Sequence, residues 1–578
     1  MARPNEEVEA LLQEYADLLA ISGGDAFKQR AYERAARAIG GYPQDVSKLD
    51  AKALKGIPGV GKSIADKIAE YLSTGHVAAI DETRSTVPPG VRELMTIPTL
   101  GPKRAMTLYR ELDVASVDDL VTAVHEDRLG RLKGFGPKAA DNILHGVELM
   151  RAAGGRILLG EALRIAEETV SGLVAATGVE RCEYAGSVRR MKETIGDIDV
   201  LVAARDEDAE AIMRAFTELP GTAEIIVHGR KKTSVRTAKG LQIDLRVLPP
   251  VSWGAGLQYF TGSQPHNIRT RSIAVRKGLK LSEYGIFDTE TGEQLHAGTE
   301  EEVYGRLDLP WIPPTLREDR GEVDAALRGE LPDLVTQDDI RGDLHTHTDL
   351  TDGLATLEQM AEAAAARGYA YYAVTDHAPE LRMQRMTSEK MLAQRDRVRA
   401  LADRYGRRLR LLHGTELNID PEGEVDWPAD FLAGFDVCVA SVHSHFGLDR
   451  AAQTRRLIRA AENPHVNIIG HPTTRKLGKR AGIDVDLDAF FAACARTGTA
   501  VEVNGHPERL DLRDEHILLA RRHGVRFAID SDAHAVSELD NLRFGVATAQ
   551  RGWLTADEVI NTWPLTRLRK FLRGPGRR

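Results

Sequence analysis

The spacing of hydrophobic positions changes along the chain. Over about the first 150 residues, apolar positions follow the pattern of short amphipathic helices separated by glycine and proline turns. After residue 156, predicted helices alternate with predicted strands such as residues 198–202 and 225–227. Beyond residue 341, buried strands are predicted at residues 371–374, 437–440 and 466–469. This alternation is typical of a parallel α/β architecture, so we expect a multidomain α/β protein with a helical N-terminal region.

Three turns in the N-terminal region repeat one pattern, at residues 54–65, 94–105 and 129–140. Glycines permit a tight turn in each, and a helix is expected to begin at the lysine that follows. Backbone N–H groups at such a helix start can bind a phosphate and so hold DNA without reading its sequence, although a purely structural αα-turn is the alternative. The middle repeat has Thr99 in place of a glycine. The candidate DNA-binding residues are Gly59, Gly61, Lys62, Gly101, Lys103, Gly134, Gly136 and Lys138.

The most specific motif of the first half is a pair of aspartates two positions apart. Asp197 and Asp199 share one face of a predicted strand, and Asp244 lies on a second predicted strand with the same alternation. Three converging carboxylates can hold two Mg²⁺ or Mn²⁺ ions roughly 4 Å apart, as nucleotidyl transfer requires. A preceding tight turn supplies donors for the phosphates of a nucleotide. Its candidate residues are Gly186, Ser187 and Arg190.

Histidines and carboxylates gather in short clusters in the C-terminal half, where twelve of the 18 histidines follow residue 341. Several clusters come directly after a predicted strand. Imidazole and carboxylate ligands repeated at strand ends are what a hydrolytic site with several metal ions on an α/β barrel needs. The clusters lie at residues 343–347, 352, 375–377, 414–416, 443–445, 470–472 and 530–534.

Composition alters this interpretation only slightly. A hydrophobic content of 42% and a charged content of 28% are typical of a soluble protein, and no run approaches the roughly 18 apolar residues of a membrane span. Without a signal-peptide pattern at the N-terminus, we expect a cytoplasmic protein.

The net charge of −9 argues weakly against DNA binding, but basic residues gather at 230–239 and 475–480. Cys182, Cys438 and Cys494 are expected to be buried thiols in a reducing compartment.

Residues 27–32, 57–61 and 65–72 resemble the small N-terminal domain of family X DNA polymerases, the group that includes DNA polymerase beta. In lyase-active members a Schiff-base lysine of this domain removes a 5′-deoxyribose phosphate, and Lys67 matches that lysine. Ser63 stands where the family has an auxiliary lysine, and a solvated helix lysine is the alternative interpretation of Lys67.

The resemblance to family X continues through the aspartates into residues 259–263 and implies template-directed addition of deoxynucleotides. It also implies that the aromatic pair borders the sugar, that Asn267 reaches the base edge and that Arg271 contacts the template side. Met191 and Gln264 depart from the family pattern, which bears on affinity and fidelity. The implied pocket residues are Tyr259, Phe260, Gly262, Ser263, Asn267 and Arg271.

The C-terminal clusters resemble a PHP (polymerase and histidinol phosphatase) domain, which implies a distorted β/α barrel and a trinuclear metal site. Histidine-rich ligation favours Mn²⁺, Zn²⁺ or Fe²⁺, so two to three such ions are expected. The tandem arrangement implies a Mn²⁺-dependent 3′→5′ exonuclease or a related end-processing activity, with His445 and Asn504 orienting phosphate or water. The implied ligands are His345, His347, Asp352, His377, Glu416, His443, His471, Asp532 and His534.

The predicted fold is therefore a helical helix-hairpin-helix region, an α+β nucleotidyltransferase palm and thumb, and a C-terminal distorted β/α barrel. The expected segments are 1–80 (small, helical and lyase-like), 81–155 (helix-hairpin-helix, fingers-like), 156–250 (palm), 251–318 (thumb-like), 319–339 (linker) and 340–578 (PHP). We expect a monomeric repair polymerase that acts on gapped or primed double-stranded DNA with dNTPs. The alternatives are a metal-dependent nuclease or phosphatase whose polymerase half only binds DNA, a DNA-end-binding scaffold, and a small-molecule phosphatase.

Overall fold

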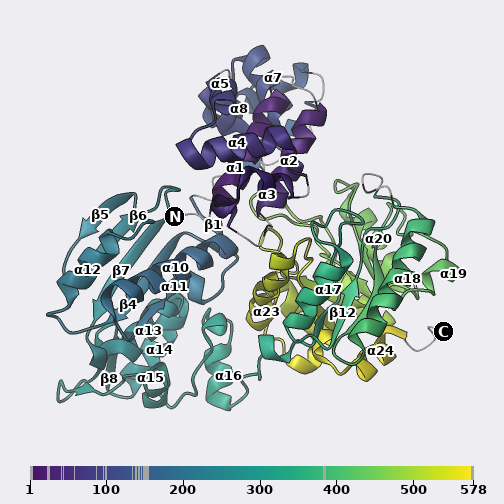
Figure 1. Ribbon diagram of the computed structural model, residues 1–578. Coiled ribbons are helices and arrows are strands. Elements are labelled where there is room, and N and C mark those ends of the chain that lie inside the picture. Colours follow the sequence, from purple (N-terminus) through teal and green to yellow (C-terminus); the bar gives the residue numbers. More distant parts are fainter. Residues whose placement is uncertain are drawn as a thin grey trace.

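The chain forms a helical N-terminal region, a sheet-containing central region and a C-terminal barrel, which lie on three sides of a common junction (Figure 1). This computed structural model describes residues 4–573 except 22–25, 41, 43–44, 58, 86, 96, 98–99, 133–134, 137–138, 141–142, 145, 148–154, 382–383 and 385. We call residues 156–250 the palm, 251–318 the thumb and 340–573 the barrel. Within the described ranges, no helix is both long enough and apolar enough to cross a membrane.

The N-terminal region packs its amphipathic helices around one core. Leu12, Ile39, Ile68, Leu94 and Leu108 are all fully buried in this core, so the repeated turns belong to one packed unit. Its helices are α1 (Pro4–Ile21), α2 (Ala26–Gly40), α3 (Ala51–Lys55), α4 (Lys62–Thr74), α5 (Ala78–Ser85), α6 (Pro89–Met95), α7 (Pro102–Leu112) and α8 (Val117–His125), with short 3₁₀ turns η1 (Val46–Lys48) and η2 (Leu129–Arg131).

The three repeated turns share their backbone hydrogen bonds. In each one, the first bond of the following helix returns to a glycine carbonyl. These bonds measure 2.9 Å from Ala65 to Gly61, 3.1 Å from Ala105 to Gly101 and 3.1 Å from Ala140 to Gly136. The second helix begins at Pro102, one residue before the predicted lysine, because proline suits the first helical position. Thr99, Gly134 and Lys138 lie outside the described residues.

The palm is a mixed sheet with the strand order β2-β4-β7-β6-β5, and β4 and β7 are its parallel pair. Its central strands alternate apolar and polar residues, so one face packs against α10 and α12. The edge strand β5 is exposed along its whole length. The elements are β1 (Ile157–Leu158), α10 (Leu159–Thr177), β2 (Cys182–Tyr184), α11 (Gly186–Arg189), β3 (Thr194–Ile195), β4 (Asp197–Ala203), α12 (Ala209–Thr217), β5 (Glu224–His228), β6 (Lys232–Arg236) and β7 (Gln242–Leu248).

The thumb follows directly from the palm, and its core extends past residue 318. Val323 and Ala326, in the segment predicted as a linker, pack with Val303 and Tyr304 of the thumb. The elements of the thumb and of the segment that follows it are η3 (Pro250–Ser252), α13 (Trp253–Thr261), α14 (Gln264–Arg276), β8 (Leu279–Ser282), β9 (Gly285–Asp288), β10 (Gln294–Leu295), α15 (Glu300–Arg306), η4 (Pro314–Leu316), α16 (Glu322–Arg328) and η5 (Gln337–Asp339).

The barrel strands are all parallel and neighbour one another in chain order, from β11 to β17. The chain segments after the first and last strands pair through bonds from His347 to Ala533 (2.9 Å) and from Asp532 to His345 (3.1 Å), which nearly closes the barrel. This arrangement confirms the predicted distorted β/α barrel. The strands are β11 (Gly342–Asp343), β12 (Tyr371–Val374), β13 (Arg410–Asn418), β14 (Val437–Ser441), β15 (Ile468–Ile469), β16 (Ala500–Asn504) and β17 (Phe527–Asp530).

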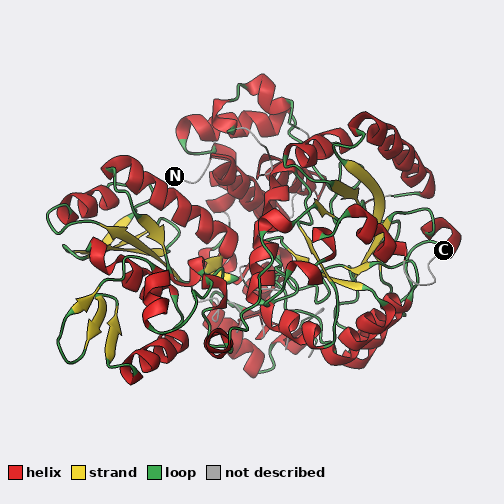
Figure 2. Cartoon of the chain, turned by 90° about the horizontal axis from the view of Figure 1, so that it is seen from below, coloured by secondary structure: helices red, strands yellow, loops and turns green. Residues whose placement is uncertain are grey.

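Helices surround the barrel strands on the outside (Figure 2). Leu568 and Leu572 of the last helix pack into the barrel interior. The three cysteines of the chain are buried, as the sequence predicted. The helices are α17 (Leu357–Ala366), α18 (Ser388–Tyr405), α19 (Ala429–Leu432), α20 (Arg450–Glu462), α21 (Leu487–Thr497), α22 (Asp514–Arg522), α23 (Leu542–Arg551) and α24 (Leu565–Arg573), with 3₁₀ turns η7 (Val536–Asn541), η8 (Ala556–Glu558) and η9 (Ile560–Thr562).

The palm and the barrel share a hydrophobic core. Leu510 and Phe544 of the barrel are buried among the core residues of the palm. Gly160 of α10 lies so close to the barrel that an added Cβ atom would be 3.0 Å from the Cβ atom of Pro507. Arg475, in one of the basic clusters, pairs with Glu193 of the palm at 2.8 Å. The two halves are therefore packed against each other as parts of one rigid interface.

Phe544→Ala is expected to lower the free energy of unfolding by about 3 kcal/mol, because it leaves a cavity between the barrel and the palm core. Chemical denaturation of the full-length chain measures this change. Val275→Ala, at a side chain that is 71% exposed, is the control and is expected to change stability by less than about 0.5 kcal/mol. Equal stabilities of the two variants would contradict a shared core.

Candidate active sites

Three carboxylates lie close together on two adjacent interior strands of the palm sheet. Asp197 and Asp199 project from β4, and Asp199 lies directly opposite Asp244 of the parallel strand β7. Ile198 and Val200 point to the other face and are fully buried, which holds the aspartates in register. Burial, with the charges of Asp197 and Asp244, raises the pKa of Asp199 to about 6. Such a cluster of like charges favours cation binding, and the donor set fits divalent ions with oxygen ligands.

Asp244 has cationic and amide partners that the sequence did not indicate. Lys232 Nζ lies 2.6 Å from one of its carboxylate oxygens, and Gln242 donates to the other at 2.8 Å. Burial opposes ionisation of Asp244, but hydrogen bonds from Lys232, Ser234 and Gln242 hold its pKa below the usual range. Lys232 was recognised only as part of a basic run. Its proximity to Asp244 results from the pairing of β6 with β7.

The turn before β4 approaches the aspartates closely. Gly186 has a φ of 63°, and a Cβ atom there would lie 2.8 Å from Asp199 Oδ2. The neighbouring Ala185 N–H donates to the Asp199 carbonyl at 2.8 Å. Only glycine combines this left-handed conformation with so close a contact. Ser187 follows this glycine at the start of α11.

Among the predicted pocket residues of the thumb, two side chains bond to the backbone and two aromatic rings are partly open to solvent. Asn267 is buried and donates to the carbonyls of Tyr259 (2.7 Å) and Gly262 (3.2 Å), while Ser263 accepts from the His266 N–H at the start of α14. These two side chains hold the bend between α13 and α14. Tyr259 and Phe260, with ring centroids 5.2 Å apart, are only half-buried.

Arg271 and Arg190 differ in their surroundings. Arg271 is exposed and donates to the Asn267 carbonyl at 3.2 Å. Arg190 is enclosed at the junction of palm and thumb. Its Nε donates to Glu318 at 3.0 Å, and its Nη1 donates to the Thr261 carbonyl at 2.8 Å.

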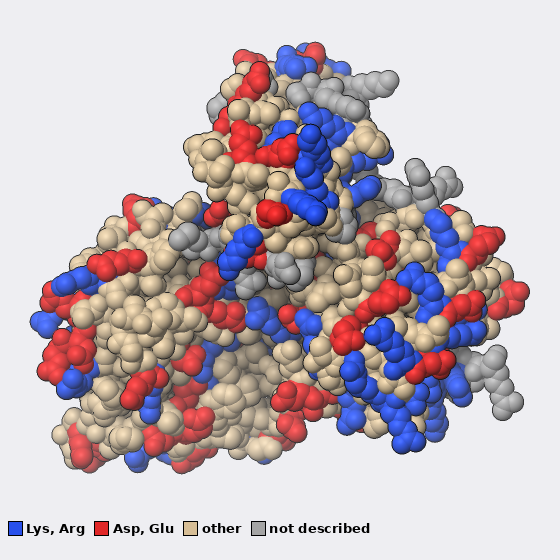
Figure 3. Space-filling model, in the orientation of Figure 1, with Lys and Arg blue, Asp and Glu red and all other residues tan. Residues whose placement is uncertain are grey.

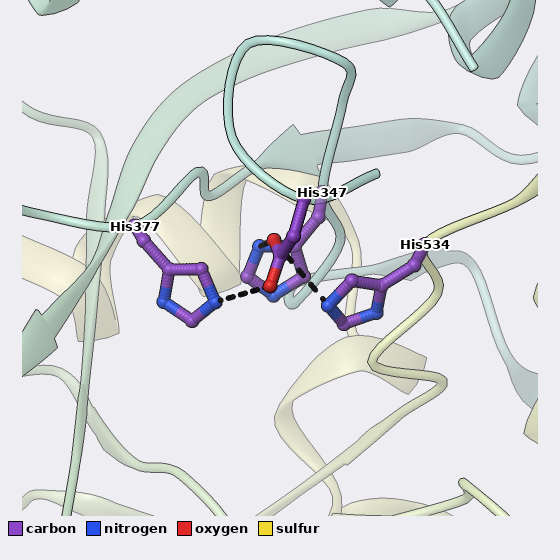
Figure 4. Close-up of side chains that lie close together, drawn as sticks. His347, His377 and His534 are labelled. Carbon is purple, nitrogen blue, oxygen red and sulfur yellow. Dashed lines mark ion pairs between the residues drawn. The ribbon is translucent and has the colours of Figure 1, made fainter. Parts of the chain in front are cut away.

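The predicted barrel ligands converge at the carboxyl ends of the parallel strands. Figure 4 shows His347, His377 and His534 directed toward a common point; Asp352 pairs there with His377 (3.3 Å) and His534 (3.5 Å). Ligand atoms within 4.8 Å of one another form three overlapping groups. These are His347, Asp352, His377 and His534; His345, His347 and Asp532; and His377, Glu416 and His443.

Glu416 occupies the centre of the barrel site. Ring nitrogens of five predicted histidine ligands lie 2.8–3.6 Å from its carboxylate, and His471, which is absent from the three groups, is one of them at 3.1 Å. Burial opposes ionisation, but the imidazoles of His443, His377 and His345 hold the pKa of Glu416 well below its usual range. Glu416 would therefore contribute a carboxylate to the metal-binding cluster.

Several ligand atoms in this cluster are buried without a hydrogen-bond partner among the described residues. They include His345 Nε2, both ring nitrogens of His347 and Asp352 Oδ1. Buried polar atoms are normally satisfied, and coordination of a metal ion would satisfy these. The residues therefore fit several divalent ions held by imidazole and carboxylate groups.

Residues outside the predicted ligand set orient the ligands. Glu502, which we did not identify from the sequence, lies 2.6 Å from His345 Nδ1 and accepts from the His471 N–H at 2.5 Å. Its only signal in the sequence is a carboxylate within the buried strand β16. Asn504 donates to Asp532 at 3.0 Å, so it contacts a ligand directly. His445 is exposed, and its Nδ1 lies 2.9 Å from the hydroxyl oxygen of Ser444.

The N-terminal region presents exposed basic residues beside the first repeated turn. Lysine and arginine side chains gather over α2 (Figure 3), where Lys28, Arg30 and Arg34 are exposed. A Cβ atom on Gly59 would lie 3.1 Å from Arg34 Cγ, so this turn packs on α2. Gly61 and Gly101 begin α4 and α7 without a side-chain cap, and both are exposed.

Lys67, the candidate Schiff-base lysine, lies on α4 at the protein surface. Its Nζ is 3.3 Å from the hydroxyl of Ser63, one helical turn earlier. Lys62, Asp66 and Glu70 line the same shallow hollow. The lyase role of Lys67 stays a prediction from the sequence.

Comparison with known proteins is consistent with this organisation. Residues 3–77 match a helix-hairpin-helix domain, 91–148 a SAM-like helix-hairpin-helix tandem, 256–318 a DNA polymerase beta thumb and 343–554 a PHP domain. The chain is 35% identical to the DNA polymerase/3′-5′ exonuclease PolX of Bacillus subtilis, over 98% of this chain and 99% of that protein. It is 27% identical to DNA polymerase lambda of Arabidopsis thaliana over half of this chain and 58% of that protein. A probable phosphatase of Thermoanaerobacter is 27% identical over 40% of this chain and 94% of its own length.

Glu502→Gln is expected to weaken metal binding in the barrel about 10- to 100-fold, because the carboxylate that orients His345 is lost. Equilibrium dialysis against Mn²⁺, followed by metal analysis of the protein, measures the affinity. Glu508→Gln is the matched control, since Glu508 pairs with Lys479 rather than with a ligand. Unchanged Mn²⁺ affinity in the Glu502 variant would show that the carboxylate does not support the ligand.

Proposed function

The chain belongs to the family X DNA polymerases that carry a C-terminal PHP domain, and we propose that its two centres act on the same kind of DNA end. The palm adds deoxynucleotides to the 3′ ends of short gaps. The barrel removes nucleotides from 3′ ends or hydrolyses phosphoesters left there. The observation that carries this proposal is the presence of two separate clusters on one chain, three aspartates in the palm and nine converging imidazole and carboxylate side chains in the barrel, which are candidate metal ligands.

In the palm, Asp197, Asp199 and Asp244 would hold two Mg²⁺ or Mn²⁺ ions. Such ions, when bound, activate a 3′-hydroxyl and neutralise the charge of the triphosphate. Gly186 allows the phosphate-binding turn to approach Asp199, so phosphates held at that turn lie beside the carboxylates. Lys232 keeps Asp244 ionised and oriented.

Nucleotide selection falls to the half-buried aromatic pair and the residues that support it. Tyr259 and Phe260 offer apolar edges for the sugar, and Arg246 lies over the Phe260 ring at 4.6 Å. Asn267 fixes the bend that carries them through its bonds to backbone carbonyls. Arg271 is exposed, so it is available to a template strand.

In the barrel, the nine residues would hold two to three ions of Mn²⁺, Zn²⁺ or Fe²⁺. Such ions, when bound, lower the pKa of a bridging water and polarise a phosphoryl oxygen. Glu416 lies between the ligand groups and connects them. Glu502 fixes the orientation of the His345 ring, and Asn504 fixes Asp532.

The helix-hairpin-helix turns would hold the DNA by its phosphates. The carbonyls of Gly61, Gly101 and Gly136 accept the same pair of backbone hydrogen bonds from the helix that follows, which supports a common role. The basic surface over α2 adds favourable charge beside the first turn. That the protein is monomeric and cytoplasmic, and that Lys67 supports a lyase step, stay predictions from the sequence.

Replacing Asp197 and Asp199 with alanine is expected to reduce primer extension by about 10³-fold or more, because groups that stabilise charge in the transition state contribute about 10²- to 10³-fold each. Hydrolysis should be preserved, since the barrel centre is separate. A 5′-labelled primer on gapped DNA with Mn²⁺, with and without dNTPs, measures both activities. Extension by the double variant at the wild-type rate would place the chemistry elsewhere.

The reverse variant, His345→Ala with His347→Ala, is expected to lose shortening of the labelled primer and to retain extension. The imidazoles of both residues contribute to the barrel ligand groups, so their loss should remove metal ions. His413→Ala is a suitable control, because His413 stacks on Phe435 and is outside the predicted ligand set. A variant that lost both activities equally would contradict two independent centres.

A further inference from the structure

An arginine of the barrel lies in direct contact with the nucleotide-binding turn of the palm. Arg551 ends helix α23 and is 4% exposed. Its Nη1 donates to the Arg190 carbonyl at 2.8 Å and to Glu318 Oε1 at 3.0 Å. The hydroxyl of Thr315, three residues before Glu318, donates to Gln550 Oε1 of α23 at 3.4 Å. The end of α23 therefore contacts both the palm and the segment that closes the thumb.

The position of Arg551 is fixed from the barrel side. Its Nε and Nη2 both donate to Asp514 Oδ2, at 2.9 and 2.7 Å, and Asp514 begins helix α22. Arg320 pairs with the same carboxylate at 3.0 Å. A guanidinium is a rigid planar donor, so an arginine bound along two edges transmits its position accurately.

Glu318 joins the barrel arginine to the palm arginine. Its Oε1 accepts from Arg190 Nε and from Arg551 Nη1, each at 3.0 Å. Burial opposes ionisation of this carboxyl, but Arg190, Arg551 and Lys192 hold its pKa below the usual range. Glu318 therefore stays ionised between two guanidinium groups that would otherwise repel each other.

This arrangement leaves one edge of Arg190 for a ligand. Nε is bound to Glu318 and Nη1 to the Thr261 carbonyl, whereas among the described residues Nη2 has no recorded hydrogen bond. The same residue follows the turn of Gly186 and Ser187, where we have placed the phosphates of the nucleotide. A guanidinium held at two nitrogens is pre-oriented, which lowers the entropy lost when a phosphate binds the third.

We propose that Arg551 of the PHP domain is a positioning residue for nucleotide binding in the palm. It holds Glu318 and the Arg190 carbonyl, and through them it sets the orientation of the Arg190 guanidinium toward the triphosphate. The inference rests on the proposed role of the Gly186 turn in binding dNTPs. It adds that the barrel contributes to polymerisation in addition to its own hydrolytic centre.

The apolar interface provides the rigidity that this role requires. Phe544 lies on the same helix as Arg551 and is buried in the palm core, and Leu510 joins the same core. Helix α23 is thereby anchored at two places, at Phe544 by apolar contact and at Arg551 by charge. A shift of the barrel relative to the palm would change the position of Arg190.

The test is steady-state extension of a gapped primer by full-length Arg551→Met, with dNTP concentration varied. The KM for dNTP is expected to rise about 5- to 50-fold, the range of a typical coupling between two sites, while kcat changes by less than about threefold. Glu318→Gln should raise the KM similarly. The double variant, Arg551→Met with Glu318→Gln, should have a KM for dNTP no higher than that of either single variant. Each single substitution already breaks the contact between Arg551 and Arg190 through Glu318, so the second adds nothing.

Arg543→Met is the matched control. Arg543 is on the same helix and pairs with Glu167 of the palm at 3.1 Å, but it has no contact with Glu318 or with Arg190 among those the structure describes. Its KM for dNTP should remain within about twofold of the wild type. An equal rise in KM for Arg543→Met would mean that any loosening of the interface has this effect, and would overturn the proposal.

Hydrolysis of a 3′-terminal nucleotide with Mn²⁺ shows whether the barrel is intact in each variant. If Arg551→Met loses hydrolysis as well, Glu318→Gln decides, since Glu318 lies outside the barrel and this substitution changes no residue of the barrel. A KM within twofold of wild type for Glu318→Gln would overturn the proposal. A lower KM would do the same, because Glu318 would then compete with the nucleotide for Arg190.

Arg190→Ala separates this inference from the function on which it rests. If that variant raises the KM and Arg551→Met does not, the proposed nucleotide site stands and the role of Arg551 is wrong. If Arg190→Ala leaves the KM unchanged, the assignment of the phosphate-binding turn fails. A rise in both variants, with hydrolysis preserved, supports the site and the positioning role together.

Discussion

Asp199 lies opposite Asp244 on paired strands of the palm, and in the barrel Glu416 lies within 3.6 Å of five imidazole rings. Groups brought this close together cannot all be satisfied by one another, because like charges repel and buried ring nitrogens lack donors or acceptors. Divalent cations satisfy both requirements. The surrounding residues serve the same end, since Lys232 orients Asp244 and Glu502 orients His345. The need to hold cations thus explains the arrangement of both centres and of the residues that support them.

The palm and the barrel are joined by an apolar interface. Leu510 and Phe544 complete the hydrophobic core of the palm from the barrel side. Because packed cores are not continuously deformable, this contact allows the buried Arg551 at the end of α23 to keep its position against the carbonyl of Arg190. The barrel therefore carries a hydrolytic centre of its own and also supports the structure of the palm. Arg551 makes the contact between the two parts, because it donates to Glu318 at the end of the thumb and to Asp514 of the barrel.

The N-terminal region contains three turns with the same backbone hydrogen bonds. The three turns use the same bonds to Gly61, Gly101 and Gly136, although their sequences differ at other positions. The exposed starts of α4 and α7, at Gly61 and Gly101, are the places where we propose that backbone N–H groups bind a phosphate. Similarity to helix-hairpin-helix families over residues 3–77 and 91–148 agrees with this reading.

The sequence by itself determined the local elements and the types of ligand. Alternation around Asp197 and Asp199 predicted β4, apolar runs such as residues 371–374 predicted barrel strands, and the spacing of histidines and carboxylates predicted metal binding. These signals are local, because side-chain direction alternates along a strand and turns need particular residues.

Only the tertiary structure decided which distant residues meet. It brought Lys232 to Asp244, Glu502 to His345 and Arg551 to Arg190. It also folded the predicted linker into the thumb core and made an edge strand of residues 224–228. Strand register and domain packing are set by the fit of whole surfaces, and no short segment of sequence contains that information.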